Sequence, residues 1–81
     1  MSVHMFATIL PRVPFQGGYV QATKSVRGKT WRVSAWIEHR LPSGREYHTL
    51  AHTRVRRSQE AALKAATEMA IFWSRANPEV Q

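Results

Sequence analysis

Most of the basic side chains of this 81-residue chain lie in one stretch of the sequence. Residues 18–57 carry nine basic side chains and two acidic ones, Glu38 and Glu46, whereas the rest of the chain carries three of each. The formal net charge of +7 therefore belongs to this stretch. The positive charges of such an excess repel one another, so an excess of this size is usually there to bind an anion, most often nucleic acid. The plainer alternative is a basic surface that is only solvated. The nine residues are Lys24, Arg27, Lys29, Arg32, Arg40, Arg45, Arg54, Arg56 and Arg57.

Arginine makes up seven of these nine residues. Its planar guanidinium pairs with phosphates and base edges and stacks on rings, whereas lysine is a point charge. Trp36 lies four residues from both Arg32 and Arg40, so on a strand the three side chains share one face. A tryptophan between arginines is a platform on which a base can stack. Two alternatives stay open, in which an amino-terminal arm or a dimer interface covers Trp36.

A second group of cations, Arg54, Arg56 and Arg57, precedes a predicted helix. The N–H groups of a helix's first turn are unpaired and the helix dipole is positive there. A phosphate could therefore sit at Ser58 between Arg56 and Arg57. Ordinary loop charge is the alternative interpretation.

The four histidines offer little that points to catalysis. His48 and His52 lie about 13 Å apart if the segment is a strand, so we predict no metal site. His48 with Glu38 or Glu46 across a hairpin could act as the acid–base pair of a small ribonuclease, but nothing in the sequence singles out these pairs. The chain has neither Cys nor Asp, which excludes disulfides, thiolate zinc sites and cysteine nucleophiles. We therefore predict no catalytic residue and no cofactor.

The elements that must position these side chains begin with a helix at residues 59–76. Ser58 is a good N-cap, the segment is rich in alanine, and Asn77-Pro78 ends the helix. At 100° per residue one apolar stripe forms, which we expect to pack on a sheet. Its members are Ala62, Leu63, Ala66, Met69, Ala70 and Trp73.

Three strands are predicted upstream of the helix, at residues 19–26, 30–41 and 46–55. In the second, Trp31, Val33, Ala35 and Ile37 alternate with polar residues, so they should face the helix. In the third, Leu50 and Ala51 are adjacent, so its faces cannot be assigned. Short turns join the strands, as in an antiparallel meander.

The predicted fold is α+β: a three-stranded antiparallel meander with one carboxy-terminal helix packed on one face, in the order β-β-β-α. Residues 18–77 form this domain, and residues 78–81 are a disordered tail. Residues 1–17 form an extended arm or an extra strand at residues 5–10, because Pro11 and Pro14 rule out a helix. The arm's apolar residues are expected to cover Ile71 and Phe72 on the helix: Phe6, Ile9, Leu10, Val13 and Phe15.

The segment RVRRSQEAALKAATEMA after three strands resembles the carboxy-terminal two-thirds of a double-stranded-RNA-binding domain. The resemblance implies that Arg56, Arg57 and Lys64 contact phosphates across the major groove. In place of that family's first helix this chain has Pro11 and Pro14. The Gly-Pro-x-His loop of that family is also absent here, because residues 26–29 of this chain read Val-Arg-Gly-Lys.

The same β-β-β-α order is similar to that of small DNA-binding domains that lay a sheet in the major groove, such as the amino-terminal arm-binding domain of tyrosine integrases. That resemblance is topological and covers residues 18–76. It implies that the residues of the uncovered sheet face, Arg32, Trp36 and Arg40, read the nucleic acid.

The sequence therefore predicts a small, non-catalytic protein that binds nucleic acid, RNA or DNA, or another polyanion. Its binding residues would be Arg27, Lys29, Arg32, Trp36, Arg40, Arg45, Arg54, Arg56 and Arg57. The alternative is a protein-interaction domain, a homodimer, with no role in nucleic-acid binding. No run of about 18 apolar residues occurs, so we expect no membrane insertion. The first 13 residues lack a secretory pattern, so we expect a cytoplasmic protein.

Overall fold

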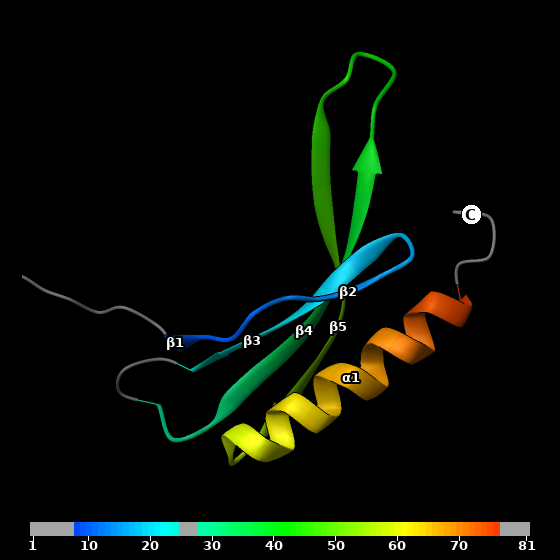
Figure 1. The fold of residues 1–81 in the computed structure, drawn as a ribbon. Helices are drawn as coiled ribbons and strands as arrows, with labels where there is room; N and C mark the ends of the chain where they lie inside the picture. The colour runs from blue at the N-terminus through cyan, green and yellow to red at the C-terminus, as the bar shows by residue number, and fades with distance from the viewer. Residues whose placement is uncertain (1–7, 25–27, 77–81) are drawn as a thin grey trace, which may run out of the picture.

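The computed structural model describes residues 8–24 and 28–76 and shows an α+β fold, an antiparallel sheet with one helix across one face (Figure 1). Within these residues the sheet has five strands, and the predicted meander forms its main part. The elements are β1 (Thr8–Ile9), β2 (Val13–Phe15), β3 (Gly18–Lys24), β4 (Trp31–Arg40), β5 (Glu46–Arg56) and α1 (Gln59–Ala76).

The described part of the amino-terminal arm pairs with the sheet. The sequence alone did not decide between this pairing and a separate extended arm. β1 and β2 both pair antiparallel with β3, on the edge opposite β4. Between them the Leu10 N–H donates to the Ala22 carbonyl at 3.0 Å, so the pairing continues towards Pro11. β2 was not predicted as a strand because it contains Pro14, which lacks an N–H. An edge strand tolerates proline because one side of the strand needs no partner.

The helix begins and ends at the predicted residues. The Ser58 hydroxyl accepts a hydrogen bond from the Ala61 N–H at 3.1 Å, so the predicted N-cap is confirmed. The buried stripe differs at its margin from the prediction. Leu63 is exposed, whereas Ala65 is buried. The helix therefore packs on the sheet through the side of Ala62 on which Ala65 lies, and Leu63 lies on the other side.

The core lies between α1 and one face of β3 and β4. Val20 pairs with Ala35 and Ala22 pairs with Val33, and all four side chains are buried under the helix. Trp31 closes one end of this layer at 4% exposure, as its place in the alternation predicted. Alanines on both sides let helix and sheet approach closely. The buried helix residues are Ala62, Ala65, Ala66, Met69 and Ala70.

A β-bulge in β5 explains why its faces could not be assigned from the sequence. Ala35 pairs with His52 but Trp36 pairs with Leu50, so Ala51 is an extra residue without a partner. The alternation of β5 side chains between the two faces of the sheet therefore shifts by one residue at Ala51. As a result Leu50 shares a face with Trp36, whereas His52 lies on the helix side with Ala35.

The outer half of the β4–β5 hairpin stands away from α1 (Figure 1). Across it His39 stacks on Tyr47 with ring centroids 4.6 Å apart, and Arg40 pairs with Glu46. The turn closes through the Gly44 N–H, which donates to the Leu41 carbonyl at 2.9 Å. Gly44 has a φ of 91°, a left-handed conformation that glycine adopts readily.

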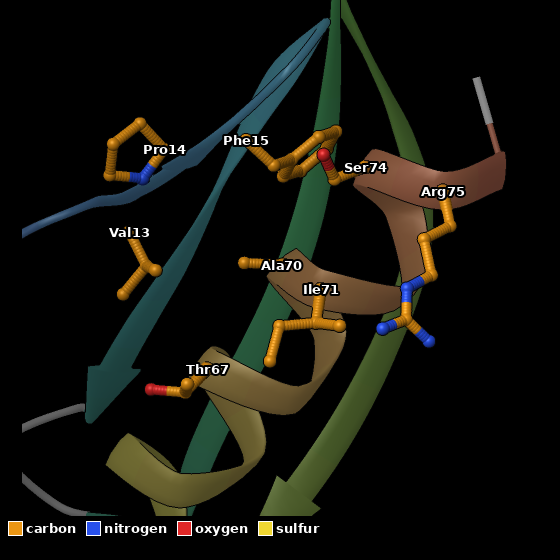
Figure 2. A pocket seen from close by; sticks show the side chains of 8 residues that line it. All are labelled: Val13, Pro14, Phe15, Thr67, Ala70, Ile71, Ser74 and Arg75. Atoms are coloured by element: carbon orange, nitrogen blue, oxygen red, sulfur yellow. The ribbon is translucent and has the colours of Figure 1, made fainter. Parts of the chain in front are cut away.

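The expectation that the arm covers Ile71 and Phe72 was wrong for Phe72 and only partly right for Ile71. The two residues share one hollow on the helix surface, but each also lines a different groove between the helix and the sheet. Ile71 lines a groove of about 350 Å³ with Val13, Pro14 and Phe15 but is still 50% exposed (Figure 2). Phe72 faces β5, at the edge remote from the arm, and is 61% exposed. Ile9 is also exposed, and Phe6 lies outside the described residues.

The close approach of β3 to β4 generates a prediction at Gly18. A Cβ at this position would lie 1.9 Å from the Trp36 carbonyl oxygen and 2.9 Å from a Phe15 ring carbon. Gly18→Ala should therefore lower the free energy of unfolding by about 3 kcal/mol or more. Gly44→Ala is the matched control, because open space surrounds its Cβ and only the left-handed φ costs stability, about 1 kcal/mol. Urea denaturation followed by tryptophan emission measures both, and equal losses would contradict the close-approach account.

Candidate nucleic-acid interface

The face of the sheet opposite α1, which we call the open face, carries the predicted tryptophan and two of the arginines. The strand register places Arg32, Trp36 and Arg40 on this face, as the alternation predicted. Trp36 lies at its centre, between Tyr19 of β3 and Leu50 of β5, and is half-buried. Arg32 lies between Thr23 and Val55 and is exposed.

A row of side chains beside Trp36 was missed by sequence reasoning. The Arg12 guanidinium lies 4.0 Å above the centre of the Tyr19 ring. Tyr19 Oη forms a hydrogen bond with His48 Nδ1 at 3.2 Å, and His48 Nε2 lies 3.8 Å from Glu38 Oε2. Tyr19 is only 7% exposed beneath these neighbours. The row therefore fixes Arg12 as a cation on the open face next to Trp36.

The signal that could have placed Arg12 is the alternation of the arm. Val13 and Phe15 pack against the core, so the Arg12 side chain must face the other way once the arm is extended. The sequence did not establish that the arm pairs with β3. Arg12 was therefore counted with the neutral part of the chain.

The row also brings together one of the pairs considered for a nuclease. Glu38 faces His48, whereas Glu46 pairs with Arg40. Both ring nitrogens of His48 face side chains of the sheet, which gives this histidine a structural role. His52 lies on the opposite face, because the bulge separates it from His48 in phase. Among residues 8–24 and 28–76, no three histidine or acidic side chains gather where they could hold a metal ion.

The charges on the open face differ along β4. Arg40 pairs with Glu46, so its charge is locally balanced. Arg12 and Arg32 have no carboxylate within 4 Å among the described residues. Arg32 and Arg40 are about 26 Å apart along the strand, since eight residues separate them. Arg45 is exposed at the hairpin tip.

A second group of cations lies at the end of the molecule where α1 begins. Trp31 pairs with Arg56, which brings the turn before β4 beside the connection from β5 to α1. Lys29 and Arg57 are both exposed there. Arg56 is partly buried and donates to the Val55 carbonyl at 2.8 Å. Arg27 lies outside the described residues.

Arg54 and Arg56 do not lie on the open face. The register pairs Arg54 with Val33 and Arg56 with Trp31, which places both on the helix side of β5. The eight described residues of the predicted set are therefore spread over the open face, the hairpin tip, the helix-start end and the helix side of the sheet edge. The sequence could not separate these groups, because the bulge at Ala51 hides the phase of β5.

Comparison of the chain with known protein families, with curated proteins and with solved structures found no match to any of them. The helix of the described part of the chain is too polar to cross a membrane.

The contact between Arg12 and Tyr19 generates a testable prediction. A double-mutant cycle with Arg12→Ala and Tyr19→Leu should give a coupling energy of about 0.5–1 kcal/mol, the usual size of a cation–π pair near a surface. Chemical denaturation of the four proteins measures it. Strictly additive losses would mean that Arg12 does not rest on the ring in solution.

Proposed function

We propose that this chain is a small, non-catalytic nucleic-acid-binding protein that binds through the open face and the basic helix-start end. The observation that carries the proposal is the exposure of a sheet face on which arginines without carboxylate neighbours flank a half-buried tryptophan. Arg12 and Arg32 would contact phosphates or base edges, and Trp36 would stack on a base.

The positions of the other cations support a contact that continues around one end of the molecule. Arg32 is adjacent in sequence to Trp31, whose partner on β5 is Arg56, so the open face meets the end that carries Lys29 and Arg57. A polyanion lying along the open face would reach these side chains as well. Arg40 would add less, because Glu46 already balances its charge.

The proposal makes a direct prediction for binding. Labelled duplex RNA, duplex DNA and single strands are titrated with the protein at several salt concentrations. We expect a micromolar or tighter Kd at physiological salt for one of them, with quenching of tryptophan emission. If about six phosphates are neutralised on duplex DNA, the log–log slope against salt is about −5. Binding to every probe only at low salt, or to none, would contradict the proposal.

Matched variants locate the surface in the same titration. Arg32→Ala should weaken binding and reduce the magnitude of the salt slope by about 1. Trp36→Leu should cost about tenfold in affinity, because it removes a stacking ring, and should remove the quenching. Lys64→Ala is the control, since Lys64 is exposed on the helix, away from the open face. Weakening by Lys64→Ala but not by Arg32→Ala would support the helix-based contacts of a double-stranded-RNA-binding domain instead.

A second candidate function, a homodimer that pairs its open faces, rests on a different observation. Ile9, Leu50 and Val55 lie on the open face and are each more than half exposed. Exposed apolar residues around a tryptophan are typical of a protein interface. Sedimentation velocity at low micromolar concentration separates the two functions. A stable dimer that Leu50→Glu dissociates would support the homodimer, whereas a monomer would contradict it.

A further inference from the structure

The outer edge of β5 has no strand beside it in the described part of the chain. β5 is 11 residues long, and its only strand partner there is β4. In an antiparallel strand every second residue directs its N–H and C=O to the side away from the partner. Such an edge is a template on which an extended chain can add one more strand.

A groove runs along the inner half of this edge, on the helix side. Its lining residues are His52 and Arg54 of β5 and Met69, Phe72 and Trp73 of α1, and its volume is about 320 Å³. Phe72 and Trp73 meet edge to face with ring centroids 5.3 Å apart. Met69 is buried beneath them. Alternate side chains of an added strand would point into this groove, whose floor is apolar.

The charge around the groove favours an acidic occupant. Arg54 Nε donates to His52 Nε2 at 3.3 Å, which holds the guanidinium on the groove wall. Arg56 lies two residues along the same face. None of the described lining residues is acidic. The nearest acidic helix residue, Glu68, lines a separate hollow on the other side of Phe72.

Charge disfavours two symmetric pairings of this edge with a second copy of the chain. A symmetric antiparallel pairing centred on Ala51 would set Glu46 opposite Arg56. The bulge, however, puts Glu46 on the open face and Arg56 on the helix side, so the two charges would point apart. A pairing confined to the segment after the bulge and centred on Arg54 would set this arginine opposite its own copy, which repels.

The groove on the other flank of α1 lies beside a strand edge that is less able to accept an added strand. It is lined by β2, which contains Pro14 and follows Pro11. A proline-bearing edge offers fewer N–H groups to an added strand. The β5 flank alone combines a long strand edge, an apolar floor and a cationic wall among the described residues.

We propose that β5 binds an extended acidic peptide segment of another protein, which adds to the sheet as an outer strand. On the face of the added strand that points to the helix side, apolar side chains would enter the groove over Phe72 and Trp73. Carboxylates at other positions of that same face would meet Arg54 and Arg56. Apart from Arg56, which also belongs to the helix-start end, this surface lies on the opposite side of the sheet from the open face. The proposal therefore does not rest on nucleic-acid binding.

The test uses a fluorescein-labelled ten-residue peptide with Thr at every second position and Ile and Glu by turns at the positions between, so that Ile and Glu share one face. It is titrated into the full chain at physiological salt. Phe72→Ala should weaken binding by about tenfold, and Arg54→Gln by about fivefold or more. Two matched controls should stay within about twofold. Ile71→Ala truncates the adjacent helix residue, which faces the other groove, and Lys64→Gln removes one exposed charge from the helix.

Two N-methylated peptides report on strand addition itself. One is methylated at the Thr amides and the other at the Ile and Glu amides. An added strand uses every second amide, so one peptide should lose binding and the other should keep it. Backbone amide shifts should concentrate at residues 52–56. Equal binding of both methylated peptides, equal weakening by Arg54→Gln and Lys64→Gln, or displacement of the peptide by a nucleic acid on the same residues would overturn the proposal.

Discussion

The packing of one alanine-rich helix on one face of a narrow sheet is the interaction on which the rest of the structure depends. Ala62, Ala66 and Ala70 bring α1 close to β3 and β4, where Val20 and Val33 are fully shielded from solvent. A chain of 81 residues supplies only one such helix in its described part. The opposite face of the sheet therefore has no helical cover, and its side chains are free to serve another purpose.

The open face is ordered even without a covering element. Tyr19 is buried there by Arg12 above its ring and by His48 at its edge. These polar side chains therefore shield part of the open face from solvent, as a second layer of structure would. This arrangement holds the Arg12 guanidinium over Tyr19, which is the cross-strand partner of Trp36. In the proposed nucleic-acid contact, a cation held in this way would lose little conformational entropy on binding.

The bulge at Ala51 decides which side chains of β5 lie on each face of the sheet. Before it Leu50 and His48 belong to the open face, and after it Arg54 and His52 belong to the helix side. The extra residue thus moves basic side chains from the face that carries Trp36 to the groove beside Phe72. It also breaks the symmetry that self-pairing of the edge would need, which is one way in which proteins protect exposed strands.

Local patterns in the sequence were enough to predict the helix, the three long strands and the face of β4 that the helix covers. The alternation in β4 predicted that Trp31 is buried and that Arg32 and Trp36 share the other face, and Ser58 with Asn77-Pro78 predicted the bounds of α1. These patterns are local, because a strand repeats every two residues and a helix every 3.6. Which cations lie together, by contrast, depends on the tertiary fold. The pairing of the arm with β3 placed Arg12 over Tyr19, and the bulge moved Arg54 away from Arg32. Both depend on contacts between residues distant in sequence, which no local pattern specifies.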